Sequence, residues 1–429
     1  MIKANKKPIN MQPQQKNGVK SPLFFAALAL FSASSFAVDL TTAFEMAKAN
    51  DPKYQAAKNE KTANNADSLA GRLGYLPALG WNQSQPSTIN YSQKTTMISQ
   101  PIFDAAKFSG VAQGGPRNTF ASANLSNQEI DLAQRTMTAV QQIVVATEAI
   151  RANDTSISAL ESQYQGAKRK YELGQGTVTD MLDVQVKFEQ AKANSLTVNA
   201  NLKAAQDQFN AITGEYPAKT DFALPHKHEL VKLQALDEIL SKAQEENTAI
   251  IAAKANERIS HLAVVTASAA VLPTVSYTWQ RISAVSQPTS NNNGLTVTIP
   301  LNAAAYATTY SAVAKARASS DNRLATEVQT KTQAQGLYAQ VEAGFESLKI
   351  RNQAMDTARL SVTANQKSYE AGVKTTTDVL LAIQNLAQTR NDYAQAATQQ
   401  ALNYMNLLLV GAEDPDQAMV KTQAFLFRK

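Results

Sequence analysis

The sequence of 429 residues contains no cysteine. This absence excludes disulfide scaffolds, thiol nucleophiles and cysteine-ligated metals. Long apolar runs are also missing: after the N-terminal segment, the longest candidate, residues 262–273, is too short for a transmembrane helix and ends in proline. Large apolar residues are spread thinly among Ala, Gln, Asn and Thr, and this composition favours long helices over a compact globule.

Common catalytic and nucleotide-binding motifs are absent as well. No Walker A and no G-x-S-x-G motif occurs, and the pair Gly174 and Gly176 lacks the third glycine and the preceding strand of a dinucleotide loop. His226 and His228 stand two residues apart, but their proline-flanked connector favours an exposed segment over a metal site. We therefore expect no catalytic residue, no metal and no cofactor.

Residues 1–37 have the pattern of a cleaved signal peptide. A segment with five lysines and no acid precedes the apolar run Leu23 to Phe31, and Ser35 and Ala37 have the small-residue spacing that a signal peptidase reads. Met11 is an alternative initiator. Cleavage after Ala37 lowers the formal net charge from +6 to +1, so we expect no nucleic-acid partner.

The remaining chain is an internal repeat. The stretch YELGQGTVTD at Tyr171 to Asp180 returns as YEAGVKTTTD at Tyr369 to Asp378, and the flanking segments match at offsets of 196 to 199 residues. Each copy has the order helix, Leu-Pro, strand region, long helix, turn and long helix. We predict two structural repeats, a connector and a C-terminal tail, at residues 38–216, 236–411, 217–235 and 412–429.

Each repeat contains a region with the period-two alternation of β-strands. In the second repeat the strands are expected over about 274–301, where Tyr277 and Trp279 alternate with polar residues. The polar stretch 286–294 is expected to be the loop between them. The strands of the first repeat are expected over about 79–103, where the pattern is weaker.

Two hairpins of this kind give four strands, each long enough for a tilted strand that crosses an outer membrane. Four strands are too few to close a barrel, and an open edge in lipid leaves backbone groups unsatisfied at several kcal/mol each. Several copies must therefore pool their strands if the sheet enters a membrane, where Tyr277 and Trp279 suit an interfacial aromatic girdle. The alternative is a soluble four-stranded sheet packed on helices.

The longest segments are helical. About 55 residues from Asn118 to Leu173 predict a helix on the order of 80 Å long, and Val379, Leu386 and Tyr393 form a heptad-like seam. The seam by itself also fits a coiled coil with no further role. The Gly-Gly-Pro stretch at 114–116 is expected to break or kink the first long helix.

The repeated stretch predicts a helix-hairpin tip in both copies. Gly174 and Gly372 suit the left-handed conformation that ends a helix. Thr177 and Thr375 begin T-x-x-D capping boxes for the helices that follow. Capping alone accounts for these four residues.

The order of segments, with a Y-x-x-G-x-x-T-x-x-D turn in each repeat, resembles the TolC family of outer-membrane efflux and secretion channel proteins. The segments YEAGVKTTTDVL and ITG, at Ile212 to Gly214, are specific for it, and the resemblance covers nearly the whole chain after residue 37. It implies a mainly α fold with a small membrane β part. Three copies are expected to form one twelve-stranded β-barrel, which a periplasmic α-helical barrel continues.

The resemblance also implies a function and partners. Family members are exit ducts of tripartite efflux pumps or type I secretion systems in the outer membrane of Gram-negative bacteria. They are homotrimers that contact outer-membrane lipid and join a periplasmic adaptor, or membrane fusion protein, to an inner-membrane pump of the RND or ABC type. They have no catalytic residues.

Residue roles at the tips are implied in the same way. Tyr369 and Lys374 match the aromatic and basic residues that close the periplasmic entrance. Gln163, Thr179 and Asp180 match the groups that those residues bond. The resemblance therefore predicts a periplasmic gate in which unequal tips latch to one another.

Two further features follow from the resemblance. Asp378 matches one member of an acidic ring at the mouth, but the next acidic position of the family is Leu381 here. The turn residues are expected to meet the adaptor: Leu173, Gly174, Thr177, Ala371, Gly372 and Thr375.

Two functions therefore remain open. The first is an outer-membrane export duct gated at its helix tips. The second is a periplasmic coiled-coil adaptor or structural protein that does not enter the membrane. An adaptor is expected to have one helical hairpin between two β halves, whereas this chain has two hairpins. No motif identifies the exported substrate.

Overall fold

The computed structural model describes residues 39–427 except 86–91, 219–221, 226–231, 286 and 301–302. Ala37–Lys429 form one compact unit. The signal peptide and the histidines His226 and His228 lie outside the described residues, and what was expected of them stays a prediction.

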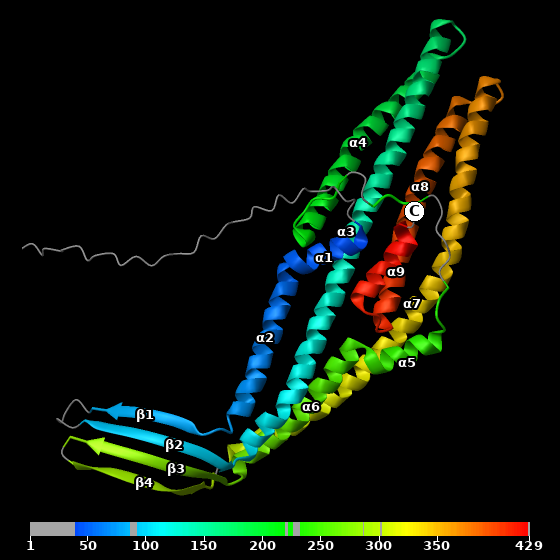
Figure 1. The fold of residues 1–429 in the computed structure, drawn as a ribbon. Helices are drawn as coiled ribbons and strands as arrows, with labels where there is room; N and C mark the ends of the chain where they lie inside the picture. Colours follow the sequence, from blue (N-terminus) through cyan, green and yellow to red (C-terminus); the bar gives the residue numbers. More distant parts are fainter. Residues whose placement is uncertain are drawn as a thin grey trace, which may run out of the picture. The chain divides into compact units, whose positions relative to one another are not determined.

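Both halves of the chain have the same order of elements (Figure 1). The first half contains α1 (Leu40–Asn50), α2 (Pro52–Leu73), β1 (Ala78–Ser84), β2 (Gln93–Phe103), α3 (Ala105–Glu172) and α4 (Val178–Thr213). The second half contains α5 (Leu236–Glu246), α6 (Thr248–Ser268), the 3-10 helix η1 (Ala269–Val271), β3 (Thr274–Ala284), β4 (Gln287–Thr298), α7 (Ala304–Glu370) and α8 (Thr376–Val410). A last helix, α9 (Pro415–Phe427), follows. No described helix is both long and apolar enough to span a membrane.

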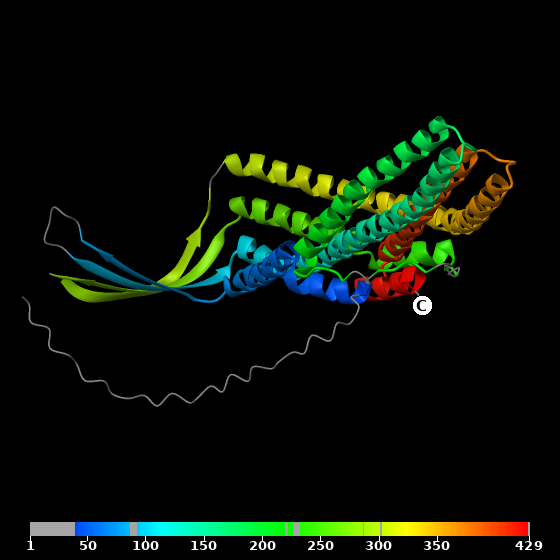
Figure 2. The same ribbon diagram turned by 90° about the horizontal axis from the view of Figure 1, so that it is seen from above.

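The long helices form two hairpins. Figures 1 and 2 show α3 running beside α4 and α7 beside α8, with both turns at the same end, and α3 also packs on α8. The predicted seam faces this packing: Val379, Ile383, Tyr393 and Ala397 are buried, and Leu386 is half-buried. The helical pairing was therefore readable from the spacing of apolar residues.

The four strands form one antiparallel sheet in the order β1-β2-β3-β4, so the two repeats meet along β2 and β3. The expected loop at 286–294 is wrong, because 287–294 belong to β4, which ends at Thr298. The main chain of β4 pairs with β3 whatever its side chains are, so a strand of polar residues shows no alternation in the sequence. Pro288 is tolerated near the start of this edge strand.

Helix α3 continues through Gly114, Gly115 and Pro116, so the expected break is wrong. Gly114 lies against α2. The Ser68 hydroxyl donates to the Gly114 carbonyl at 2.9 Å, and a Cβ at position 114 would lie 3.0 Å from Ser68 Oγ. The glycine lets two helices approach closely, and this packing outweighs the low helix propensity of the Gly-Gly-Pro stretch.

The main core lies where α1, α3, α8 and α9 meet, and it includes Leu40, Phe44, Leu132, Met405 and Leu426. The segment predicted as a C-terminal tail contains α9, which closes this core. The apolar residues of this short segment carry no signal for what they pack against. The packing of the tail was therefore missed.

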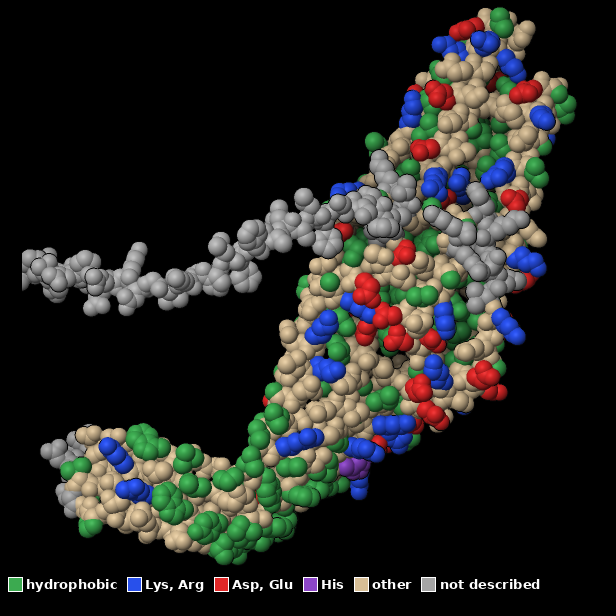
Figure 3. Space-filling model, viewed as in Figure 1, with side chains coloured by type: hydrophobic (Ala, Val, Ile, Leu, Met, Phe, Trp, Pro, Cys, Tyr) green, Lys and Arg blue, Asp and Glu red, His purple; other side chains and the backbone are tan. Residues whose placement is uncertain are grey.

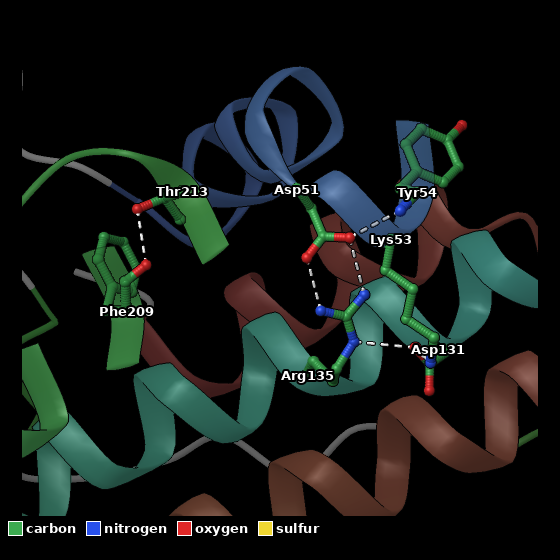
Figure 4. Close-up of polar contacts among 7 residues, drawn as sticks. All are labelled: Asp51, Lys53, Tyr54, Asp131, Arg135, Phe209 and Thr213. Carbon is green, nitrogen blue, oxygen red and sulfur yellow. Dashed lines mark hydrogen bonds and ion pairs between the residues drawn. The ribbon is translucent and has the colours of Figure 1, made fainter. Parts of the chain in front are cut away.

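Helices α1 and α2 meet at Asp51, which ends the first helix and begins the second. Its buried carboxylate accepts the Tyr54 amide at 2.8 Å and the Arg135 guanidinium at 2.7 and 3.1 Å (Figure 4). Arg135, on α3, also donates to Asp131, which pairs with Lys53 at 2.9 Å. We call these five residues the charged joint.

Candidate functional site

Each helical hairpin turns at a glycine in the left-handed conformation, as predicted. Leu173 caps α3 and is followed by Gly174 with φ +69°, and Ala371 caps α7 and is followed by Gly372 with φ +75°. A Cβ would meet nothing within 4 Å at either glycine. The requirement for glycine is therefore conformational, because L side chains rarely adopt positive φ.

Threonines begin the returning helices. At the second tip, the Thr375 hydroxyl accepts the Asp378 amide at 3.3 Å and the Asp378 carboxylate accepts the Thr375 amide at 2.9 Å, which completes the predicted capping box. At the first tip, the Thr177 hydroxyl accepts the Asp180 amide at 3.1 Å. The Thr177 hydroxyl also donates to the Asp180 carboxylate at 2.7 Å, as Thr375 does to Asp378 at 2.8 Å. The described contacts include no bond from the Thr177 amide to that carboxylate, so the first box is formed only in part.

The second tip holds Asp378 ionised. The Thr375 amide and hydroxyl, with a smaller effect from Lys374, lower the pKa of the Asp378 carboxyl. Lys374 Nζ lies 3.5 Å from Asp378 Oδ1, and the two side chains are 49% and 34% exposed. This tip therefore presents a partly neutralised carboxylate to water, beside the exposed Leu381.

The two hairpins also touch near the tips. Lys170 Nζ, on α3, lies 4.0 Å from the centroid of the Tyr369 ring at the end of α7, a cation–π contact. Gln163 is buried and donates to the Gln366 side chain of α7. Two of the predicted gate residues, Tyr369 and Gln163, thus lie at the contact between the hairpins.

Three of the remaining predicted gate residues, Lys374, Asp378 and Asp180, have partners within their own tips. The structure brings Lys374 to Asp378, and the described residues include no contact between Lys374 and Asp180. Thr179 and Asp180 are exposed. A bond from Lys374 to Asp180 therefore stays a prediction that requires another copy of the chain or another state of the tips.

A small apolar cluster lies behind the tips. It contains Leu160 and Ala167 of α3, Val184 and Phe188 of α4, and Leu380 of α8. Because α8 contributes Leu380 to the first hairpin, the tips are held together by burial as well as by polar contacts.

The family model described as "Outer membrane efflux protein" matches residues 43–215 and 239–410, one stretch in each repeat. The chain belongs to the outer membrane efflux protein family. It is 23% identical over 420 residues to the alkaline protease secretion protein AprF of Pseudomonas aeruginosa, which covers 87% of this chain and 84% of AprF. It is 22% identical over 416 residues to the outer membrane protein TolC of Escherichia coli K12, which covers 89% of this chain and 83% of TolC.

A solved structure shares the fold of this outer membrane efflux protein. The CmeC outer membrane channel of Campylobacter jejuni superposes with a TM-score of 0.75 at 13% identity, over 91% of this chain and 90% of CmeC. The predicted family and fold class are confirmed. The chain is an outer-membrane efflux or secretion channel protein with a periplasmic extension, and the adaptor alternative is not favoured.

Sequence reasoning missed a buried ion pair in this outer membrane efflux protein. Glu148 of α3, whose side chain is 9% exposed, accepts Arg390 of α8 at 3.2 Å and also pairs with Arg151 on its own helix. The pair joins the two hairpins between the main core and the tips. Glu and Arg three residues apart normally mark a solvated helix face, so the sequence carried no signal for this contact.

The aromatic pair predicted for a membrane girdle lies on β3. Tyr277 is opposite Gln100, and Trp279 is opposite Ile98. The Tyr277 hydroxyl accepts a hydrogen bond from the Asn293 side chain at 3.0 Å. Both rings project from one face of the sheet, since residues two apart on a strand point the same way.

Proposed function

We propose that three copies of this chain assemble into one exit duct in the outer membrane. The four-stranded sheet carries the proposal: β1 and β4 each have one unpaired side among the described strands. Exposed apolar residues on the sheet include Leu79, Trp81, Tyr277 and Leu295. An open edge in lipid costs several kcal/mol per unsatisfied group, so β1 of one copy pairs with β4 of the next and twelve strands close one β-barrel.

The two helical hairpins continue this duct into the periplasm as an α-helical barrel. Residues 1–37 are the signal peptide that export removes. The tips bind a periplasmic adaptor that leads to an inner-membrane pump of the RND or ABC type. Leu173 and Val373, 65% and 78% exposed at the tips, supply apolar surface for that contact. AprF and the proteases secretion protein PrtF of Dickeya chrysanthemi are named for secretion, which supports export through this duct.

The tips are the gate of the resting duct. Tyr369 and Lys374 bond Thr179 and Asp180 of a neighbouring copy, and Asp378 lines the mouth. An exposed ion pair contributes only about 0.2–1 kcal/mol, so three copies supply at most about 3 kcal/mol. An adaptor that prefers the open state by a few kcal/mol is therefore sufficient to open the duct.

Single-channel conductance tests the gate. Tyr369→Phe combined with Lys374→Ala removes the latch, and we expect a higher conductance across planar bilayers than for the wild-type trimer. Lys349→Ala is the control, because Lys349 is a 58% exposed lysine of α7, the helix that carries Tyr369, and lies far from the tip. Unchanged conductance of the double variant would show that these residues do not hold the gate closed.

A further inference from the structure

The sheet has one apolar and one polar face. Directly opposed residues of adjacent strands share a face, so the register places apolar side chains together: Leu79, Trp81, Ile98, Val275, Tyr277, Trp279, Leu295 and Val297. The other face carries mainly polar side chains, among them Thr95, Ser99, Thr278, Gln280 and Thr296. In the proposed barrel, the apolar face meets lipid.

Two cations continue the apolar face toward the strand ends that lie farthest from the helices. Arg281 lies two residues beyond Trp279 and opposite Thr96, and Lys94 lies two residues beyond Thr96 on β2. Two residues advance about 7 Å along a strand. Both side chains are exposed, and Figure 3 shows two Lys or Arg patches at that end of the sheet.

The two side chains are close enough to act on one ligand. Arg281 and Lys94 are diagonal neighbours on adjacent strands, since Lys94 is opposite Ser283. Diagonal neighbours stand about 7–8 Å apart, which is within reach of long side chains. A guanidinium beside an ammonium forms a bidentate and a point-charge donor for the oxygens of one anion.

The chain itself supplies no such anion at the sheet. The described strands contain no Asp or Glu. The sequence also has no acidic residue from Ser68 to Phe103 or from Arg258 to Ser320. A cation at a membrane boundary is stabilised by an opposite charge or by water, and the strands supply no opposite charge, so an anion that binds these cations comes from outside the sheet.

We propose that Lys94 and Arg281 bind the phosphate groups of lipid headgroups at the membrane surface. The inference rests on the membrane insertion proposed above. A lipid fits better than free phosphate because the cations adjoin the apolar face, beside Trp81 and Trp279. One molecule then places acyl chains on the apolar side chains and phosphate on the cations. The trimer has three such sites.

Lipid titration of the full-length trimer in detergent, followed by native mass spectrometry, tests the site. The probes are diphosphorylated lipid A, phosphatidylcholine and inorganic phosphate. The wild type is expected to bind the diphosphorylated lipid more tightly than phosphatidylcholine. The double variant Lys94→Gln with Arg281→Gln should weaken binding of that lipid by about 30-fold, the value for two surface cations. The matched control is Lys315→Gln with Arg317→Gln, two exposed cations of α7.

Three results would overturn the proposal. The first is equal affinity of the double variant and the wild type for the diphosphorylated lipid. The second is an equal loss in the α7 control, which would mean a general charge effect. The third is displacement of the lipid by inorganic phosphate at a concentration equal to that of the phosphate groups on the lipid, which would mean a free-phosphate site. Flotation with phosphatidylcholine vesicles separates the two proposals: a protein that floats but shows no lipid preference refutes only this site, and one that does not float refutes both.

Discussion

The joint between α1 and α2 is charged, whereas the matching joint between α5 and α6 is neutral. In the aligned repeats, Asp51 corresponds to Asn247, and each residue ends one helix and begins the next. The Asn247 side chain accepts the Ala249 amide at 3.0 Å and donates to the Val410 carbonyl at 3.1 Å. Asp51, an acceptor only, instead binds Arg135 of α3.

The two repeats meet the same backbone requirement with different side chains, a carboxylate at Asp51 and an amide at Asn247. Both joints need an acceptor for the first amides of the second helix. In the second repeat the Asn247 side chain also bonds the last carbonyl of α8, the returning helix of that repeat. In the first repeat the returning helix is α4, and its last carbonyl, at Thr213, accepts a hydrogen bond from the neighbouring residue Asn50 at 2.7 Å. Asp51 is thereby left to fix α3, and of the two capping residues only Asp51 titrates.

Removal of Arg135 should give the largest difference between the joints. Arg135→Met leaves the Asp51 carboxylate, 5% exposed, without its cation. We expect a loss of about 2–3 kcal/mol in the free energy of unfolding, below the range for a fully buried pair because Arg135 is 30% exposed. Urea unfolding in detergent, followed by circular dichroism, measures this loss. Lys53→Met, at the exposed edge of the same joint, should change it by less than about 1 kcal/mol, and equal losses would contradict the assignment.

Truncation of the neutral joint should cost less. Asn247→Ala removes a cap and the hydrogen bond to Val410, for which we expect a loss of about 1–2 kcal/mol. The same urea titration applies. Asn247→Asp keeps the acceptor but loses the donor, so it should recover part of the loss. If it were as unstable as the alanine variant, the cap would not be the stabilising contact.

Of the three tests, lowering the pH should give the smallest difference in stability between the joints. Burial by itself raises the pKa of the Asp51 carboxyl, but hydrogen bonds from Arg135 and the Tyr54 amide outweigh it, and the pKa is lowered. Burial also raises the pKa of the Asp131 carboxyl, but hydrogen bonds from Lys53 and Arg135 outweigh it, and that pKa is lowered as well. Such groups stabilise the fold above the unfolded pKa of about 3.9, and this contribution is lost as the pH falls through the lower folded pKa.

We therefore expect the urea midpoint to decline as the pH is lowered from about 5 to about 3. Arg135→Met, already less stable at pH 7, should decline less steeply over the same range. Asn247→Ala removes no titrating group, so its curve should run parallel to that of the wild type. Parallel curves for the wild type and Arg135→Met would mean that other carboxyls dominate the acid response.

The repeat pattern predicted the features that rest on local chemistry. Gly174 and Gly372 were predictable because positive φ excludes most residues, and Thr375 because its cap lies within four residues. The seam at Val379 and Tyr393 was readable because helical periodicity repeats along the sequence. Local rules therefore predicted the position and the conformation of both tips.

Features that depend on distant partners could not be predicted in this way. The helix through Gly114 depends on Ser68 of another helix, and β4 is a strand because β3 pairs with it. Glu148 looks like a surface residue until Arg390 of α8 lies beside it. None of these contacts can be predicted from residues that are neighbours along the chain.

The packing of α9 has a consequence for the order of events during folding. The Thr41 amide donates to the Gln423 side chain, which in turn donates to Asp39, across 382 and 384 residues. Closing a contact of such sequence separation carries a large loop-closure cost in entropy. Leu40 and Phe44, near the start of the described chain, therefore cannot complete their burial until α9, at its end, is available to pack on them. A chain shortened before α9 is expected to keep that apolar surface exposed to chaperones and proteases.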